Sequence, residues 1–272
     1  MKLFYRQYGQ GHPLIILHGL FGLSDNWTTL AKQFGENGFA VHTFDLRNHG
    51  QSPWSDEFSY ELMVNDVVET ISNLHLPISI LGHSMGAKVA MLLALNHPDK
   101  VDKLIAVDMA PKYYPPHHQY IFNAIHALGD MSQYKSRKEV EQKFSNAIPE
   151  VTKQFLLKNL YWKNPDVGAQ NFEPLQAPAL AWRFNVDVIE RNVEDMSITA
   201  SLSFGEGHGV RPFTKPTLFV KGENSAYVTP ADEPEIKYLF PQAIFKTIPG
   251  AGHWVHADKP KEFFEASLDF LK

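Results

Sequence analysis

Short apolar runs that each end near a glycine or an aspartate recur along the chain. They lie at 14–17, 39–44, 78–81, 104–107, 217–220 and 244–248. The opening segment, 2–8, alternates between apolar and polar residues instead, as a half-buried strand does. Continuous apolar runs bounded in this way are typical of parallel strands that are covered on both faces. The pattern therefore predicts a largely buried sheet.

Helical spacing of apolar residues appears between several of these runs. Val64 and Val67 share one face of a predicted helix, and Ser59 is placed to cap its N-terminus. A second helix follows Ser84, and a third begins at Pro260. Strands that alternate with helices predict an α/β fold with a doubly wound, mostly parallel sheet. In such sheets ligands bind at the carboxyl ends of the strands.

The alternation stops between residues 112 and 211. This stretch shows no convincing pair of strands, but it contains helix-like segments at 120–128, 137–147 and 151–160. A connection of this length is too long for a loop. We therefore expect an α/β core formed by 1–111 and 212–272, and a helical cap, 112–211, inserted between the sixth and seventh strands. The glycine-rich segment 203–213 is expected to act as a hinge for the cap, with His208 solvated in it.

Composition and charge exclude several classes of function. The 272 residues carry 25 basic and 30 acidic side chains, a net charge of −5, which argues against a nucleic-acid binder. The absence of cysteine excludes disulfides, thiolate zinc sites and a thiol nucleophile. The first residues contain no apolar signal core, and no apolar run approaches the roughly 20 residues of a membrane helix. A cytoplasmic location without membrane contact is the expectation.

Residues 82–86 read GHSMG and match the G-x-S-x-G pattern of a nucleophile elbow. An apolar strand leads into the motif and a helical pattern leaves it, which is the context that the chemistry needs. A sharp bend there holds Ser84 in a strained conformation, and side chains at 82 and 86 would collide with neighbouring elements. We expect Ser84 to be a nucleophile; a glycine-rich turn with an incidental serine is the structural alternative.

A serine hydroxyl needs a base to remove its proton. The last apolar run is followed by a glycine-rich loop and His253, which is the predicted base. His256, three positions on, could suggest a metal pair with His253. No nearby carboxylate-rich cluster supports that interpretation, so neither a metal nor an organic cofactor is expected.

Three carboxylates are candidates for the acid that would orient the imidazole. The loop after the penultimate strand is the common place for it, but that loop has Ser225 at the usual position. Asp108, at the end of the strand after the nucleophile helix, is the favoured candidate, and Glu223 and Asp232 are the alternatives. A purely structural role for Asp108 would be to form hydrogen bonds with the backbone of the loop that leads into the helical cap.

A loop after the strand 14–17 reads HGLFG, from His18 to Gly22. A tetrahedral intermediate needs hydrogen-bond donors aimed at its developing negative charge. The backbone N–H groups of Leu20 and Met85 are expected to form this oxyanion hole. An ordinary strand-to-helix turn is the alternative interpretation of the loop.

Together these motifs resemble the α/β-hydrolase superfamily over nearly the whole chain. HGLFG, DLRNHGQS at 45–52, GHSMG and GAGHWVH occur in the order that the superfamily uses. The chain is most similar to YbfF-type esterases, through LIAVDMAP with Asp108, a GENSAYV loop without the usual acid, and WRFN at 182–185. The resemblance implies an acid on the Asp108 strand.

The resemblance also implies a reaction and a substrate class. It indicates a cofactor-independent serine esterase that acts on small acyl esters through an acyl-enzyme intermediate. The protein itself is expected to be a monomer or a homodimer. The alternatives are an acyl-CoA thioesterase or a carbon–carbon bond hydrolase or lyase that uses the same residues. A non-catalytic ligand receptor on the same scaffold is a further alternative.

Overall fold

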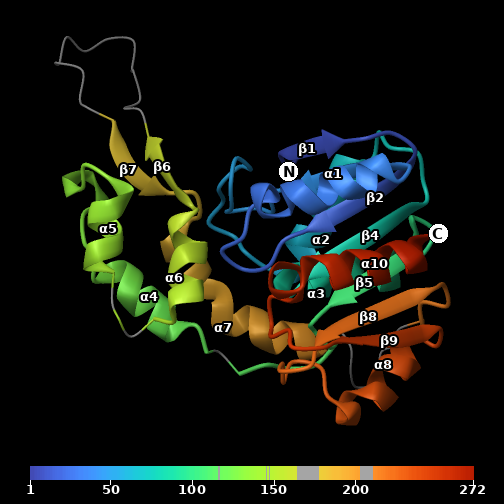
Figure 1. The fold of residues 1–272 in the computed structure, drawn as a ribbon. Coiled ribbons are helices and arrows are strands. Elements are labelled where there is room, and N and C mark those ends of the chain that lie inside the picture. Colours follow the sequence, from blue (N-terminus) through green and yellow to red (C-terminus); the bar gives the residue numbers. More distant parts are fainter. Residues whose placement is uncertain (116, 145, 147, 164–177, 203–210) are drawn as a thin grey trace.

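Seven strands form one sheet in the computed structural model of this chain (Figure 1). Their order is β1-β3-β2-β4-β5-β8-β9, and β1 alone runs antiparallel to its neighbour. The strands are β1 (Tyr5–Tyr8), β2 (His12–Leu17), β3 (Phe39–Phe44), β4 (Ile78–His83), β5 (Val101–Val107), β8 (Thr217–Gly222) and β9 (Ala243–Ile248). The structure describes residues 1–272 except 116, 145, 147, 164–177 and 203–210. The predicted doubly wound, mostly parallel sheet is confirmed.

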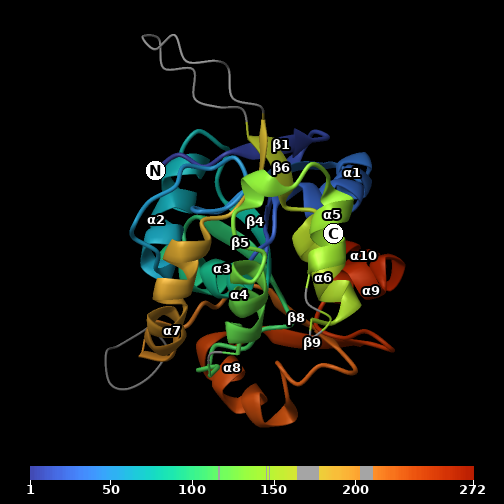
Figure 2. The same cartoon turned by 90° about the vertical axis from the view of Figure 1, so that its left-hand side faces the viewer.

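Helices cover both faces of this sheet (Figures 1 and 2). One face carries α1 (Thr28–Glu36), α9 (Val255–Asp258) and α10 (Pro260–Leu271), and the other carries α2 (Tyr60–Ile71), α3 (Met85–Asn96) and α8 (Glu233–Leu239). In β2, Leu14 and Ile16 join the first apolar layer, whereas Ile15 and Leu17 join the second. Successive side chains of a strand point to opposite faces, so burial on both sides explains the unbroken apolar run.

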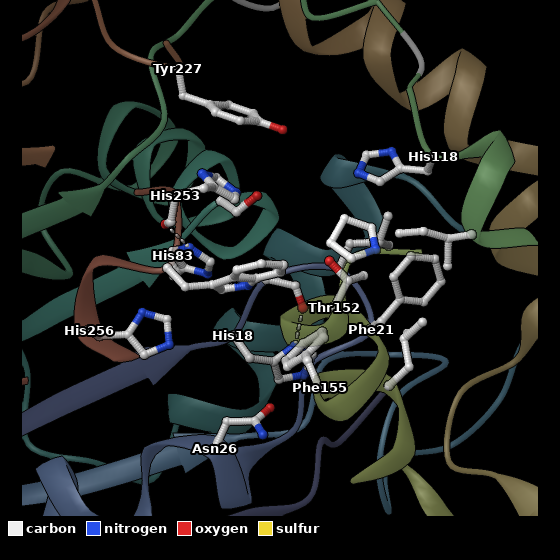
Figure 3. Close-up of a pocket in the computed structure, with 18 of the residues that line it drawn as sticks. His18, Phe21, Asn26, His83, His118, Thr152, Phe155, Tyr227, His253 and His256 are labelled. Atoms are coloured by element: carbon white, nitrogen blue, oxygen red, sulfur yellow. Dashed lines mark hydrogen bonds between the residues drawn. The ribbon is translucent and has the colours of Figure 1, made fainter. Parts of the chain in front are cut away.

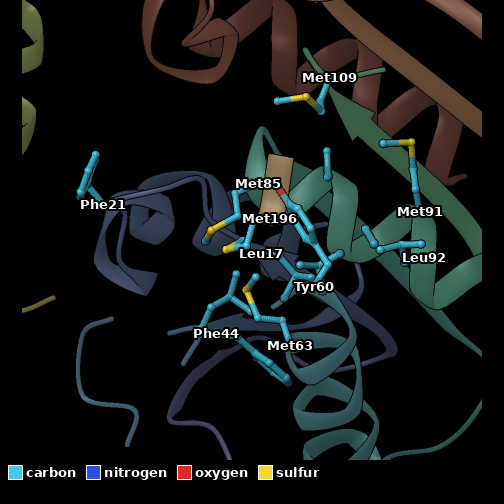
Figure 4. Close-up of a cluster of buried hydrophobic side chains, with 14 of the residues drawn as sticks. Leu17, Phe21, Phe44, Tyr60, Met63, Met85, Met91, Leu92, Met109 and Met196 are labelled. Carbon is cyan, nitrogen blue, oxygen red and sulfur yellow. The ribbon is translucent and has the colours of Figure 1, made fainter. Parts of the chain in front are cut away.

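Local signals place the helices as the sequence predicts. The Ser59 side chain accepts a hydrogen bond from the Leu62 N–H at 3.2 Å and so caps α2. Methionines and aromatic rings fill the space between α2, α3 and the sheet, as Figure 4 shows for Tyr60, Met63 and Met91. This packing fixes α3, and with it the bend that precedes α3.

The cap lies between β5 and β8, the fifth and sixth strands of the main sheet, one position earlier in the count than expected. It contains α4 (Gln119–His126), α5 (Arg137–Lys143), α6 (Glu150–Leu157), β6 (Leu160–Lys163), β7 (Ala179–Trp182) and α7 (Val186–Leu202). Strands β6 and β7 pair antiparallel, so the expectation of a stretch without a strand pair is wrong. Each of the two strands has four residues, and the two lie far apart along the chain. The sequence near each strand therefore carries little signal for their pairing.

Backbone hydrogen bonds fasten the cap to the core. The Gly50 N–H donates to the Arg183 carbonyl at 2.6 Å, and the Asn185 N–H donates to the Asn48 carbonyl at 2.9 Å. The WRFN segment therefore joins the cap to the loop after β3. The glycines expected to form a hinge, and His208 with them, lie outside the described residues.

Candidate active site

Ser84 occupies a sharp bend between β4 and α3, with φ 53° and ψ −117°. A Cβ atom on Gly82 would collide with the Gly86 carbonyl, and one on Gly86 would lie 2.5 Å from the Leu17 carbonyl oxygen. The bend therefore requires glycine at both positions, in agreement with the steric argument from the sequence. It leaves Ser84 half-buried at the N-terminus of α3.

Asp108 follows β5 directly and is completely buried, with φ 48°. Its Oδ2 atom lies 2.7 Å from Nδ1 of His253. The Gly222 N–H donates to its Oδ1 atom at 3.2 Å, and the Ser225 hydroxyl donates to Oδ2. These hydrogen bonds fix the orientation of the carboxylate toward the imidazole.

The two alternative acids have other partners. Glu223 accepts a hydrogen bond from the Gly250 N–H at 2.8 Å on an exposed loop. Asp232 is buried and forms an ion pair with Lys112, also at 2.8 Å. Burial by itself would raise the pKa of the Asp232 carboxyl, but the hydrogen bonds from Lys112 and Thr229 outweigh it and lower the pKa. Of the three candidate carboxylates, Asp108 is the one that is hydrogen-bonded to His253.

Further contacts hold the His253 loop in place. The Tyr227 ring stacks on the His253 imidazole, with 3.9 Å between ring centroids. His83, the residue before Ser84, is within hydrogen-bond distance of the His253 carbonyl through Nε2, at 3.0 Å. The sequence pattern did not single out Tyr227 or His83, because their positions depend on tertiary packing. Ser225 carried a signal, since it occupies the loop position where an acid is common.

The HGLFG loop packs directly against the bend at Ser84. A Cβ atom on Gly19 would lie 2.9 Å from Nδ1 of His83 and 3.2 Å from Cβ of Ser84. Within the described part of the chain, the N–H groups of Leu20 and Met85 donate to no other protein group. Met85 is the first residue of α3, where a helix leaves its N–H groups free. Both donors therefore remain available to a ligand.

Two buried histidines fix the backbone of this loop. His18 Nδ1 donates to the Gly19 carbonyl at 2.8 Å, and His18 Nε2 accepts from the Leu46 N–H at 2.9 Å. An imidazole that donates with one nitrogen and accepts with the other is neutral. Complete burial agrees with this, because it lowers the pKa of His18 to about 4.

His49 acts on the same loop in the same way. Its Nδ1 atom donates to the Arg47 carbonyl at 2.9 Å, and its Nε2 atom accepts from the Phe21 N–H at 3.2 Å. Burial lowers the pKa of His49 to about 3. Phe21 has a φ of 60°, so this hydrogen bond holds a strained residue beside the site.

A cavity of about 280 Å³ separates the core from the cap at this point (Figure 3). Ser84, His253 and Leu20 line it from the core. The cap contributes mainly α4 and α6, through Ile121, Thr152, Phe155 and Leu156. The walls are largely apolar, and polar groups of the core converge at one end.

His256 lines the same cavity. Its ring stacks on Trp27, with 4.1 Å between centroids, and burial lowers the pKa of His256 to about 3. No group of three or more metal-binding side chains occurs among the described residues. Likewise, none of the helices within the described ranges is long and apolar enough to cross a bilayer.

Comparison with known proteins agrees with this architecture. The family model described as "alpha/beta hydrolase fold" matches residues 12–260. The chain is 38% identical over 266 residues to the sn-1-specific diacylglycerol lipase ABHD11 of Mus musculus, covering 95% of this chain and 80% of the lipase. It is 32% identical over 261 residues to esterase YbfF of Escherichia coli, covering 95% and 92%.

A solved structure described as a marine microorganism esterase superposes with a TM-score of 0.86 at 41% identity, over 99% of both chains. The expected similarity to YbfF-type esterases is thereby confirmed. The chain belongs to the α/β-hydrolase family.

Proposed function

We propose that the protein is a serine carboxylester hydrolase that cleaves small acyl esters through an acyl-enzyme intermediate. The observation that carries the proposal is the hydrogen bond of 2.7 Å between Asp108 and His253, made beside a cavity that His253 and Ser84 both line. A nucleophile, a base and an orienting carboxylate in this order are the components of acyl transfer.

In the proposed reaction the Ser84 hydroxyl attacks the acyl carbon while His253 Nε2 takes its proton. Asp108 holds the Nδ1–H tautomer of His253 and stabilises the imidazolium. The N–H groups of Leu20 and Met85 bind the oxyanion of the tetrahedral intermediate. His253 returns the proton to the leaving alcohol, and a water molecule then releases the acid by the same steps.

The substrate class follows from the cavity and the relatives. The relatives' names include lipases and esterases. Apolar walls from the cap and a volume of about 280 Å³ suit a small or medium acyl ester. The proposed chemistry runs on side chains and backbone groups of this chain and assigns no step to a metal or an organic cofactor.

Hydrolysis of 4-nitrophenyl butyrate tests the proposal. The wild-type protein is expected to turn the ester over, and Ser84→Ala is expected to lower kcat by at least about 10³-fold. Ser72→Ala, an exposed serine at the end of α2, is the matched control and is expected to behave as wild type. Hydrolysis that is unchanged in Ser84→Ala contradicts the proposal. A much faster reaction with the matching thioester would identify the enzyme as a thioesterase.

A further inference from the structure

Lys88 is a buried cation one helical turn beyond Ser84. Its side chain on α3 is 2% exposed. The Nζ atom donates to the Lys112 carbonyl at 2.9 Å. It also lies 4.9 Å from the centroid of the Tyr114 ring and 5.7 Å from that of Tyr60. The ammonium group thus meets one carbonyl and two aromatic faces.

This environment holds no counter-ion from the described part of the chain. Among the described residues no carboxylate forms an ion pair with Lys88. Burial lowers the pKa of Lys88 to about 8, so the amine is still mostly protonated at neutral pH. A buried charge without a partner is costly, which makes this position unusual for a residue with a purely structural role.

A narrow side pocket of about 50 Å³ connects Lys88 with the nucleophile. Ser84, Met85 and Lys88 line it together, so it follows one side of α3 for a turn. Tyr60, Tyr114, Met109 and Met196 also line it, and Figure 4 shows Met85 beside Met196. The pocket and the main cavity share lining residues, namely Leu20, Ser84, His117, His118 and Tyr227. A substrate held at Ser84 therefore has access to both.

A second polar side chain of this region, His118, has an atom without a hydrogen-bond partner among the described residues. The Nδ1 atom of His118 is buried without a hydrogen bond among the described groups. Figure 3 shows the His118 ring extending from the start of the cap toward the cavity. Burial lowers the pKa of His118 to about 3, so its imidazole is neutral and offers a hydrogen bond without a charge. Lys88, which has no counter-ion among the described residues, and His118, whose Nδ1 atom has no hydrogen-bond partner there, thus line the same pocket.

Resting on the proposed function, we propose that Lys88 binds a carboxylate that the substrate carries within a few bonds of the scissile carbonyl. A group of few atoms fills the side pocket, and its negative charge compensates the buried ammonium. The main cavity then holds the rest of the ester. The preferred substrates are accordingly hemiesters of short dicarboxylic acids, with the free carboxylate on the acyl side.

The test compares kcat/KM for monomethyl succinate with that for the neutral dimethyl succinate at pH 7. Methyl 3-acetoxypropanoate and its free acid form a second pair, in which the carboxylate is on the alcohol side. We expect the wild-type enzyme to prefer the charged member of the succinate pair at least tenfold. Preference in the acetoxy pair alone overturns the acyl-side assignment, and no preference in either pair overturns the role of Lys88.

Lys88→Met replaces the ammonium by an apolar side chain of similar length in apolar surroundings. It is expected to lower the charged-to-neutral ratio at least tenfold. Lys103→Met is the matched control, because Lys103 Nζ also donates to carbonyls and lies over an aromatic ring, that of Phe270. An unchanged ratio in a folded Lys88→Met overturns the inference. If the wild-type protein shows no ester hydrolysis that depends on Ser84, the proposed function is overturned instead.

Discussion

Oδ2 of Asp108 lies 2.7 Å from Nδ1 of His253, although the two residues are 145 positions apart. Asp108 follows β5 and His253 follows β9, and β8 separates these strands in the sheet. The loop after β8 also takes part, since Ser225 donates to the Asp108 carboxylate from it. Three loops at one edge of the sheet thus meet at a single carboxylate.

Asp108→Asn should lower kcat for ester hydrolysis by about 10³–10⁴-fold, because an amide cannot hold the required tautomer of His253. Glu223→Gln is the control, since Glu223 bonds to the Gly250 N–H on an exposed loop and should retain near wild-type activity. Steady-state rates with 4-nitrophenyl butyrate give both values. A larger loss in Glu223→Gln than in Asp108→Asn would show that the acid has been misassigned.

Ser225→Ala should reduce kcat by about tenfold with little change in KM. A hydrogen bond to a charged group contributes about 1.5–3 kcal/mol, and here it orients a carboxylate that the substrate does not touch. Ser225→Thr keeps the hydroxyl and should restore most of the rate. If KM rises while kcat stays constant, Ser225 acts on substrate binding and not on the position of Asp108.

Gly19→Ala should lower kcat by about 10²-fold. The added methyl group would lie 2.9 Å from His83 and would push the loop that carries the Leu20 N–H away from Ser84. Gly129→Ala in the cap, where the nearest atom is 3.8 Å away, is the control for a general cost in stability. Rates measured beside thermal unfolding separate the two effects, and a wild-type rate in Gly19→Ala argues against this oxyanion hole.

Acidification from pH 7 to pH 5 should destabilise the fold. His18 and His49 are neutral in the folded state, with pKa values lowered to about 4 and about 3, whereas each accepts a proton near pH 6.5 once unfolded. The unfolded state therefore binds more protons between pH 6.5 and about 4, so stability falls as pH falls through that window. Each such histidine lowers the free energy of unfolding by about 2 kcal/mol at pH 5.

His49→Gln provides the matched variant for this effect, because an amide keeps one donor and one acceptor but does not titrate. Urea unfolding at pH 7, 6 and 5 should show a smaller loss in the variant, by about 2 kcal/mol at pH 5. Equal losses in both proteins would mean that His49 is not held neutral by the fold.

Much of the fold could be predicted because the main strands have strong local signals. Leu14 to Leu17 is apolar throughout since both faces of β2 are buried, and Gly82 and Gly86 mark a bend that has no room for a side chain at either of these two positions. The β6–β7 pair escaped prediction because its two four-residue strands are separated by a segment far longer than a hairpin turn.

The immediate surroundings of the candidate site were less predictable than its central residues. His18 and His49 are common residue types, and only their burial and hydrogen bonds distinguish them from surface histidines. Lys88 lies in an ordinary helical pattern, and its lack of a counter-ion emerges only from the side chains that the fold brings around it.

The central claim is that Ser84 becomes acylated, and covalent trapping tests it most directly. The protein is incubated with a fluorophosphonate, and the adduct is located by peptide mass spectrometry. One equivalent on Ser84, lost in Ser84→Ala and formed far more slowly in His253→Ala, is the predicted result. An adduct on another residue, or labelling that does not depend on Ser84, would contradict the account.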